Sequence, residues 1–122
     1  MASIVEIVSY FNSAKEQAIV FHQQTTSFSE HKALEEFYNA IVDLNDDLSE
    51  SYAGIYGRLK GYDNYDLVDW TSTADTIKYY KECYEWLKVE RTTAPQDSYI
   101  QNQLDEITQL LGSTLYKLTL TK

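Results

Sequence analysis

The chain has 122 residues, of which 43% are hydrophobic and 24% charged, and these values predict one globular domain spanning residues 1–122. Nineteen acidic residues against ten basic ones give a formal charge of −9 at pH 7. Such a field repels phosphate backbones, so direct binding of nucleic acid is disfavoured. The sequence contains no run of about twenty apolar residues and no basic leader, so neither a membrane span nor a secretion signal is predicted.

The first two helices are predicted from the spacing of apolar residues. Over residues 2–25 these recur at steps of three and four, which places them on one helix face: Ile4, Ile7, Phe11, Ala14, Ala18 and Phe21. A second helix begins after Ser27, which forms the Ser-x-x-Glu pattern of a capping box with Glu30. Its apolar face continues towards Ile55, and the glycines at 54, 57 and 61 are expected to end it.

Two more helices are predicted after a polar connection. The stretch GYDNYDLVDWTS, residues 61–72, is rich in turn formers and predicts a connection with a short helical turn at 67–70. Thr71 or Ser72 then caps a third helix. Pro95 interrupts the chain after this helix and suits the first position of a fourth. The apolar stripes of the two helices are Ile77, Tyr80, Tyr84 and Leu87, then Ile100, Leu104, Ile107, Leu111 and Leu118.

Four amphipathic helices without period-two alternation predict an all-α four-helix bundle. About twelve extended residues between the second and third helices reach roughly 40 Å, enough for a crossover along the bundle. A plain up-down-up-down bundle needs less, so the sequence allows both topologies. Trp70 and Trp86 are expected to anchor a core or an interface, and Cys83, beside Glu82, is expected to fill space in the core or on the surface without reacting. A single cysteine fits a reducing, cytoplasmic setting.

Both histidines of the chain precede a run of carboxylates. Asp46 and Glu50 follow His31 by fifteen and nineteen residues and lie one helical turn apart, so they share a face. Fifteen residues at 1.5 Å each put Asp46 roughly 22 Å along the helix from His31, which is too far for a shared metal ion. A second copy packed antiparallel across a two-fold axis would bring the histidine end of one subunit to the carboxylates of the other.

This pattern resembles the Dps miniferritins, ferritin-like proteins named for DNA protection during starvation. In that family a His ends the first helix, and a His, an Asp and a Glu follow on the second helix with the same offsets of fifteen and nineteen. The stretch FHQQTTSFSEHKALEEFYNAIVDLNDDLSE, residues 21–50, carries the likeness. The chain looks closer still to a small uncharacterised family of ferritin-like proteins encoded by tailed phages. The matching positions are His22, His31, Asp46 and Glu50, with Leu34, Glu35, Phe37, Ala40 and Asp43 as further likenesses.

The resemblance implies a ferritin-like bundle that forms at least a homodimer, or a larger shell, and binds iron between subunits, with ferroxidase and iron-storage activity. His22 and His31 of one chain would act with Asp46 and Glu50 of the other, and Glu35 would assist as an outer ligand. Two imidazoles and two carboxylates suit Fe(II), Mn(II) and Zn(II) alike, so the ligand set does not select the metal. The chain departs from the family in its short interval between the histidines and its lack of a basic tail for DNA binding.

Other interpretations use the same residues. His22 could end a helix where an imidazolium complements the dipole, and the acids from Asp43 to Glu50 could form a solvated face. At the level of function, the alternative is a non-catalytic acidic helical bundle of phage type, in the host cytoplasm, that binds a basic host protein. The charge of −9 and the short loop between the first two helices motivate this alternative.

Overall fold

The computed structural model describes residues 3–120, which contain four α-helices and no strand. The helices are α1 (Ile4–Gln24), α2 (Phe28–Tyr56), α3 (Thr73–Glu90) and α4 (Ser98–Leu118). The prediction of an all-α four-helix bundle is therefore confirmed. Residue 2, where the first helix was expected to begin, and residues 1, 121 and 122 of the predicted domain lie outside the described residues.

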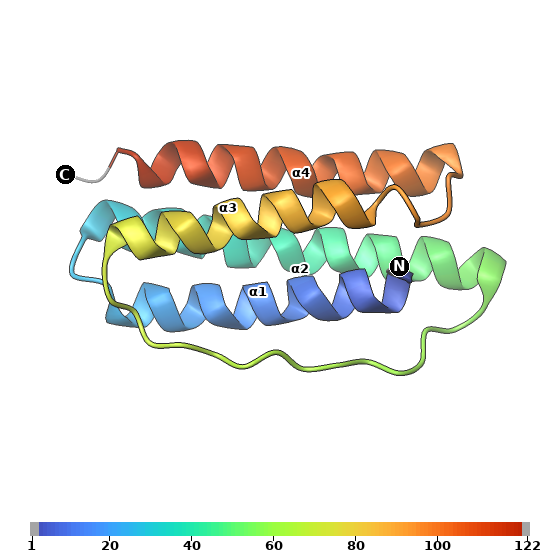
Figure 1. Ribbon diagram of the computed structural model, residues 1–122, viewed down its shortest axis with the longest axis horizontal. Helices are drawn as coiled ribbons and strands as arrows, with labels where there is room; N and C mark the ends of the chain where they lie inside the picture. The colour runs from blue at the N-terminus through green and yellow to red at the C-terminus, as the bar shows by residue number, and fades with distance from the viewer. Residues whose placement is uncertain (1–2, 121–122) are drawn as a thin grey trace.

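One long connection, residues 57–72, determines the topology. It passes back along α1 to the end of the bundle where α2 begins, so α3 starts beside the start of α2 and runs parallel to it (Figure 1). α1 and α4 run in the opposite direction. A single long crossover of this kind is typical of ferritin-like bundles. The up-down-up-down alternative is therefore wrong, because it would place α2 and α3 antiparallel.

The helix ends agree with local sequence signals in most places. Ser27 and Ser72 cap α2 and α3 by accepting hydrogen bonds from backbone N–H groups three residues ahead. α2 ends at Tyr56 because Gly57 adopts a φ of 101°, which favours glycine. Two predictions are wrong: residues 67–70 are not helical, and Asp97 rather than a residue before Pro95 is the N-cap of α4.

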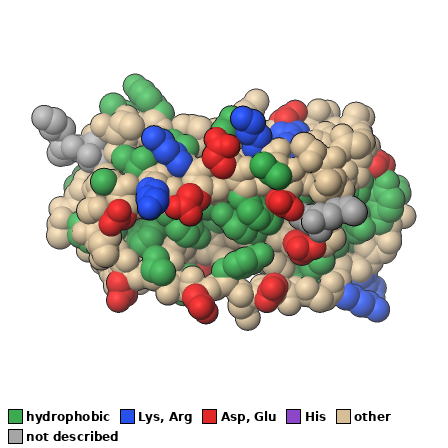
Figure 2. Space-filling view, in the orientation of Figure 1, with side chains coloured by type: hydrophobic (Ala, Val, Ile, Leu, Met, Phe, Trp, Pro, Cys, Tyr) green, Lys and Arg blue, Asp and Glu red, His purple; other side chains and the backbone are tan. Residues whose placement is uncertain are grey.

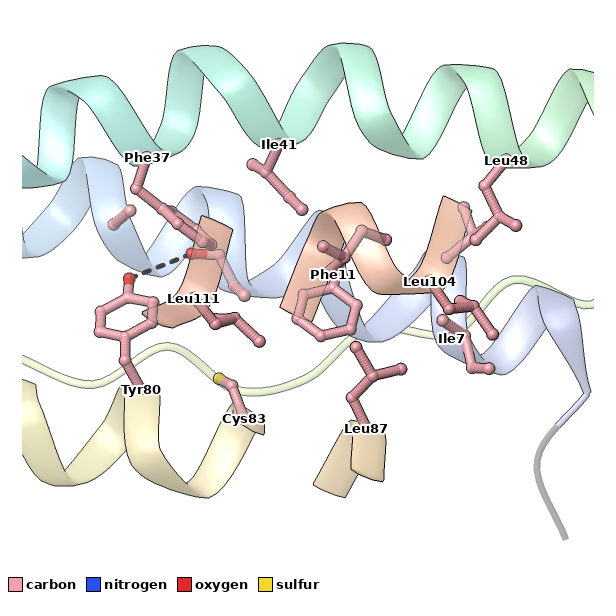
Figure 3. Packing of buried hydrophobic residues seen from close by; sticks show 14 of the residues in the cluster. Ile7, Phe11, Phe37, Ile41, Leu48, Tyr80, Cys83, Leu87, Leu104 and Leu111 are labelled. Atoms are coloured by element: carbon pink, nitrogen blue, oxygen red, sulfur yellow. Dashed lines mark hydrogen bonds between the residues drawn. The ribbon is translucent and has the colours of Figure 1, made fainter. Parts of the chain in front are cut away.

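The core lies between the apolar stripes of all four helices. Phe37, Ile41 and Leu48 of α2 point inward towards side chains from the other three helices (Figure 3). Those facing residues are fully or almost fully buried, and they include Ile7 and Phe11 of α1, Tyr80, Cys83 and Leu87 of α3, and Leu104 and Leu111 of α4. The predicted stripes are largely confirmed, because spacing at three and four residues fixes which side of a helix is apolar.

Polar side chains along one face of α1 hold the crossover in place. Ser9, Ser13 and Gln17 recur every four residues, and Gln24 follows near the helix end. Each accepts a hydrogen bond from a backbone N–H of the crossover, which has no strand partner to satisfy it. The pairs are Ser9 with Asp63 (3.0 Å), Ser13 with Tyr65 (3.2 Å), Gln17 with Val68 (2.8 Å) and Gln24 with Trp70 (2.6 Å).

Cys83 is buried among aromatic side chains between α1 and α3. Its burial raises the pKa of the thiol to about 12, and Glu82 adds to the increase, whereas a hydrogen bond with Tyr10 lowers the pKa. A protonated, buried thiol is a poor nucleophile, so Cys83 acts as a core residue. Trp86 stacks on Tyr10 with ring centroids 3.9 Å apart, and Trp86 and Trp70 both pack against the core as expected.

Acidic and hydrophobic side chains alternate on one face of the molecule. On the face shown in Figure 2, Asp and Glu side chains are spread along the length of the molecule, with hydrophobic side chains between them. Within residues 3–120, the helices lack the combination of length and hydrophobicity needed to cross a bilayer.

Candidate metal centre

His22 and His31 meet at the end of the bundle where α1 ends and α2 begins. His22 lies in the last turn of α1 and His31 in the first turn of α2. Their rings stack with centroids 3.6 Å apart and planes 17° apart. The Nδ1 atom of His22 lies 2.7 Å from the backbone oxygen of His31, and Nδ1 of His31 lies 2.8 Å from the backbone oxygen of His22. The short interval between the histidines thus produces a reciprocal pair across the turn.

These contacts determine the tautomer of each ring. A carbonyl oxygen can only accept a hydrogen bond, so each Nδ1 must carry a proton and donate it. In the neutral imidazole the lone pair then lies on Nε2. Histidine ligands of metals commonly donate their other ring N–H to a carbonyl, which fixes the tautomer and the ring orientation. When neutral, each of the two half-buried rings is therefore held in the tautomer that a metal ligand at Nε2 needs.

The stacking also limits how the two rings can share metal ions. Each Nε2 lone pair lies in the plane of its ring, and the two planes are nearly parallel. An ion about 2.1 Å from both Nε2 atoms would lie far out of at least one ring plane, because the centroids are 3.6 Å apart. The arrangement therefore favours one imidazole per ion and two neighbouring ions over chelation of one ion by both rings.

Aromatic side chains surround the histidine pair. Tyr38 packs edge-on against His22, with centroids 5.3 Å apart and an interplanar angle of 85°. Phe28 lies over His31 at 6.1 Å and is 75% exposed. Tyr38 thus lies beside the site, about two helical turns after His31.

The predicted carboxylate ligands lie along α2, away from the histidines of the same chain. Asp46 and Glu50 are exposed, and Glu35 is half-buried and pairs with Lys32 at 3.2 Å. In the part of the chain that the structure describes, no group of three or more His, Cys, Asp or Glu side chains is placed to hold a metal ion. This agrees with the length of α2, which runs unbroken from Phe28 to Tyr56. Completion of the site by a second chain stays a prediction.

One face of α2 nevertheless carries every predicted ligand except His22, which lies on α1. The residues on this face recur at steps of three and four, so they follow a single stripe along the helix. The stripe, here called the α2 ligand stripe, consists of His31, Glu35, Tyr38, Val42, Asp46 and Glu50. Histidine stands at one end and the two carboxylates at the other, which is the order that an antiparallel copy would complement.

Comparison with known protein families places the chain in a family. The model of a family of unknown function, DUF5856, matches residues 22–118. The chain belongs to the DUF5856 family. The DUF5856 match begins at His22 and extends into the last turn of α4, so it includes every predicted ligand. No curated protein and no solved structure matches the chain.

Sequence reasoning missed the role of Glu30 in this DUF5856 protein. Ser27 Oγ accepts from Glu30 N at 3.3 Å, so half of the predicted capping box forms. The Glu30 carboxylate does not return to the cap, and instead lies fully buried and accepts from Thr25, Trp70 and Thr73. Two of these donors are forty or more residues away, so no local pattern could have indicated them.

Proposed function

We propose that this protein is a ferritin-like, Dps-like homodimer that binds divalent metal ions, iron in the first place, between its subunits. The observation that carries the proposal is the histidine pair, because each ring donates Nδ1–H to the other residue's carbonyl and keeps Nε2 for a ligand bond. In each of the two sites, His22 and His31 of one chain act with Asp46 and Glu50 of the other. Glu35, one turn from His31, serves as an outer ligand.

The α2 ligand stripe sets the register of the dimer. If His31 faces the Asp46 and Glu50 turn of the partner, the two-fold axis passes α2 halfway between them, at about residue 39 or 40. Near this point the stripe carries Val42, an apolar side chain that is 39% exposed, beside the half-buried Tyr38. In the same register Lys32 approaches the partner turn that carries Asp46, so the opposite charges are complementary.

The donor set fits iron as a substrate. Imidazole nitrogen and carboxylate oxygen are both ligands of Fe(II), and one imidazole per ion leaves room for two ions in each site. Two Fe(II) ions together supply the two electrons that reduce one O₂, with two protons, to hydrogen peroxide, and they become Fe(III). The protein contributes orientation: its half-buried rings hold the ions at a fixed place next to Tyr38.

Metal binding tests the proposal directly. We expect the wild-type protein to bind Zn(II), a redox-inert probe, in calorimetric titrations, and His31→Ala to weaken the binding by at least about tenfold, since one ligand bond is lost. Aerobic addition of Fe(II) should produce ferric absorbance faster in the wild-type protein than in His31→Ala.

Asp46→Ala and Asp47→Ala form a matched pair for the same titration. Both side chains are exposed and adjacent, but only Asp46 lies on the α2 ligand stripe. Asp46→Ala should weaken Zn(II) binding as His31→Ala does, and Asp47→Ala should not. Equal behaviour of the two variants would point to non-specific attraction of cations by the charge of −9. A partner complex from lysate that survives both His31→Ala and Asp46→Ala, with no metal bound, would favour the acidic interaction protein.

The proposed interface gives a separate prediction. Val42→Glu places two like charges near the two-fold axis, so we expect the dimer dissociation constant to rise by at least about tenfold, or ~1.4 kcal/mol. Val89→Glu on α3 is the control, because Val89 is also an exposed valine, at 61%, on another helix. Sedimentation velocity over a range of concentrations measures both. Equal dissociation of the two variants would place the dimer contact elsewhere.

A further inference from the structure

Trp70 connects the two helix ends that carry the histidines. Its backbone N–H donates to Gln24 Oε1 at 2.6 Å, and its indole Nε1–H donates to Glu30 Oε2 at 2.8 Å. Gln24 lies two residues after His22, and Glu30 directly precedes His31. One residue of the crossover therefore fixes the end of α1 and the start of α2 at the same time.

Glu30 is the centre of this arrangement. Its side chain is fully buried, and besides the indole it accepts from Thr25 Oγ1 at 2.9 Å and Thr73 Oγ1 at 2.5 Å. Thr25 ends α1 and Thr73 begins α3. The carboxylate thus joins the α1–α2 turn, the end of the crossover and the first turn of α3. All three side-chain donors are neutral, and the two carboxyl oxygens of Glu30 accept from them.

We infer that Trp70 and Glu30 are positioning residues that hold His22 and His31 in the reciprocal Nδ1–H donating geometry and so present both Nε2 atoms to metal ions. The part of this inference that concerns metal rests on the proposed function. The part that concerns the two rings does not, because the hydrogen bonds between them form within one chain.

The geometry of the histidine pair explains why it depends on Trp70 and Glu30, which are together called the clamp below. Each ring donates to the backbone of the opposite helix end, at 2.7 and 2.8 Å. A shift of α2 along α1 would change the length and direction of both contacts together, because each ring lies on one helix end and its acceptor on the other. Phe28, which lies over His31, is 75% exposed and so adds little packing on that side of the pair. The buried Glu30 carboxylate and Trp70 are bonded to both helix ends and so oppose such a shift next to the histidines.

The test compares Trp70→Phe with Trp86→Phe in the metal-free protein. Trp70→Phe keeps an aromatic ring but removes the indole donor to Glu30, whereas Trp86 stacks on Tyr10 and takes no part in the clamp. Long-range ¹H–¹⁵N correlation spectra of the histidine rings report which nitrogen carries the proton. We expect both rings to be Nδ1–H tautomers in the wild-type protein and in Trp86→Phe, and a mixture of tautomers in Trp70→Phe.

Glu30 is tested by its isostere. Glu30→Gln can still accept from the indole through its oxygen and donate to the two threonine hydroxyls through its amide, so it should retain the wild-type spectrum. Glu30→Ala should give a mixture of tautomers instead of the wild-type spectrum, and a thermal melt shows whether that variant is folded. Zn(II) affinity should fall about tenfold or more in Trp70→Phe and remain within about twofold in Trp86→Phe and Glu30→Gln.

Each result decides one of the two proposals. Wild-type ring spectra in Trp70→Phe would overturn the clamp, whatever the metal affinity. Tautomer mixing in Trp70→Phe, with unchanged spectra in Trp86→Phe, would support the clamp whether or not the protein binds Zn(II). Absence of Zn(II) binding in the wild-type protein would overturn the proposed function but not the clamp.

Discussion

Two variants that bind no metal separately are expected to recover metal binding when they are mixed. One variant carries His22→Ala and His31→Ala, and the other carries Asp46→Ala and Glu50→Ala. In a heterodimer of the two, one site combines intact histidines with intact carboxylates, and the other site has neither. If subunits reassociate at random, about half of the dimers are heterodimers, so the mixture should bind about a quarter of the wild-type amount of Zn(II).

This experiment separates a shared site from any site within one chain. If all ligands came from the same molecule, mixing could not restore a site, and the bound Zn(II) would stay at the background of the separate variants. In the control, the second variant carries Asp47→Ala alone, with Asp46 and Glu50 intact. Its own homodimers should bind fully, because Asp47 is exposed on another face of α2. The subunits are exchanged in mild denaturant, and bound metal is then measured by elemental analysis.

The sequence allowed the helices to be predicted because their signals are local. Apolar spacing at three and four residues located the core faces, and Ser27 and Ser72 marked two helix starts through bonds only three residues long. Pro95 misled the prediction for α4, since its fixed φ suits a loop before Asp97 as well as a first helical turn. Turn-forming residues located the crossover but not its direction, so two topologies stayed open.

The path of the crossover depends on contacts that no local pattern contains. Ser9 and Gln17 lie on α1 yet satisfy backbone groups of Asp63 and Val68, more than fifty residues away. Polar residues at four-residue steps beside an apolar stripe were the available signal, because a polar side chain that becomes buried next to the core requires a partner. The partner itself could not be named from the sequence, since an extended segment has no periodicity to indicate its neighbours.

In the candidate site, too, local features could be predicted from the sequence and contacts between distant segments could not. The offsets of the α2 ligand stripe follow from helix geometry and could be read directly. The stacking of His22 on His31 and the burial of Glu30 could not, because both depend on how α1, α2 and the crossover meet at one end of the bundle. For this reason only half of the predicted capping box forms: Ser27 accepts from the backbone of Glu30, whereas the Glu30 side chain accepts from Trp70.

Phe37→Ala is expected to lower the free energy of unfolding by about 3–5 kcal/mol. Phe37 is fully buried, lies 5.1 Å from the Tyr80 ring and points into the centre of the four-helix core (Figure 3). Truncation removes the transfer energy of the ring and leaves a cavity that helices held by so many other buried side chains cannot close. For a chain of 122 residues this corresponds to a decrease in melting temperature of about 10–20 °C.

Phe28→Ala is the matched control, because Phe28 is the same residue type on the same helix but is 75% exposed. Its removal should change the free energy of unfolding by less than about 1 kcal/mol. Both variants must be compared at one protein concentration, since association of folded subunits would stabilise them by mass action. Equal losses would contradict the assigned core. A large loss in Phe37→Ala alone would show that α2 carries its apolar face inward along Phe37, Ile41 and Leu48, which leaves the opposite face, with the α2 ligand stripe, for a second chain.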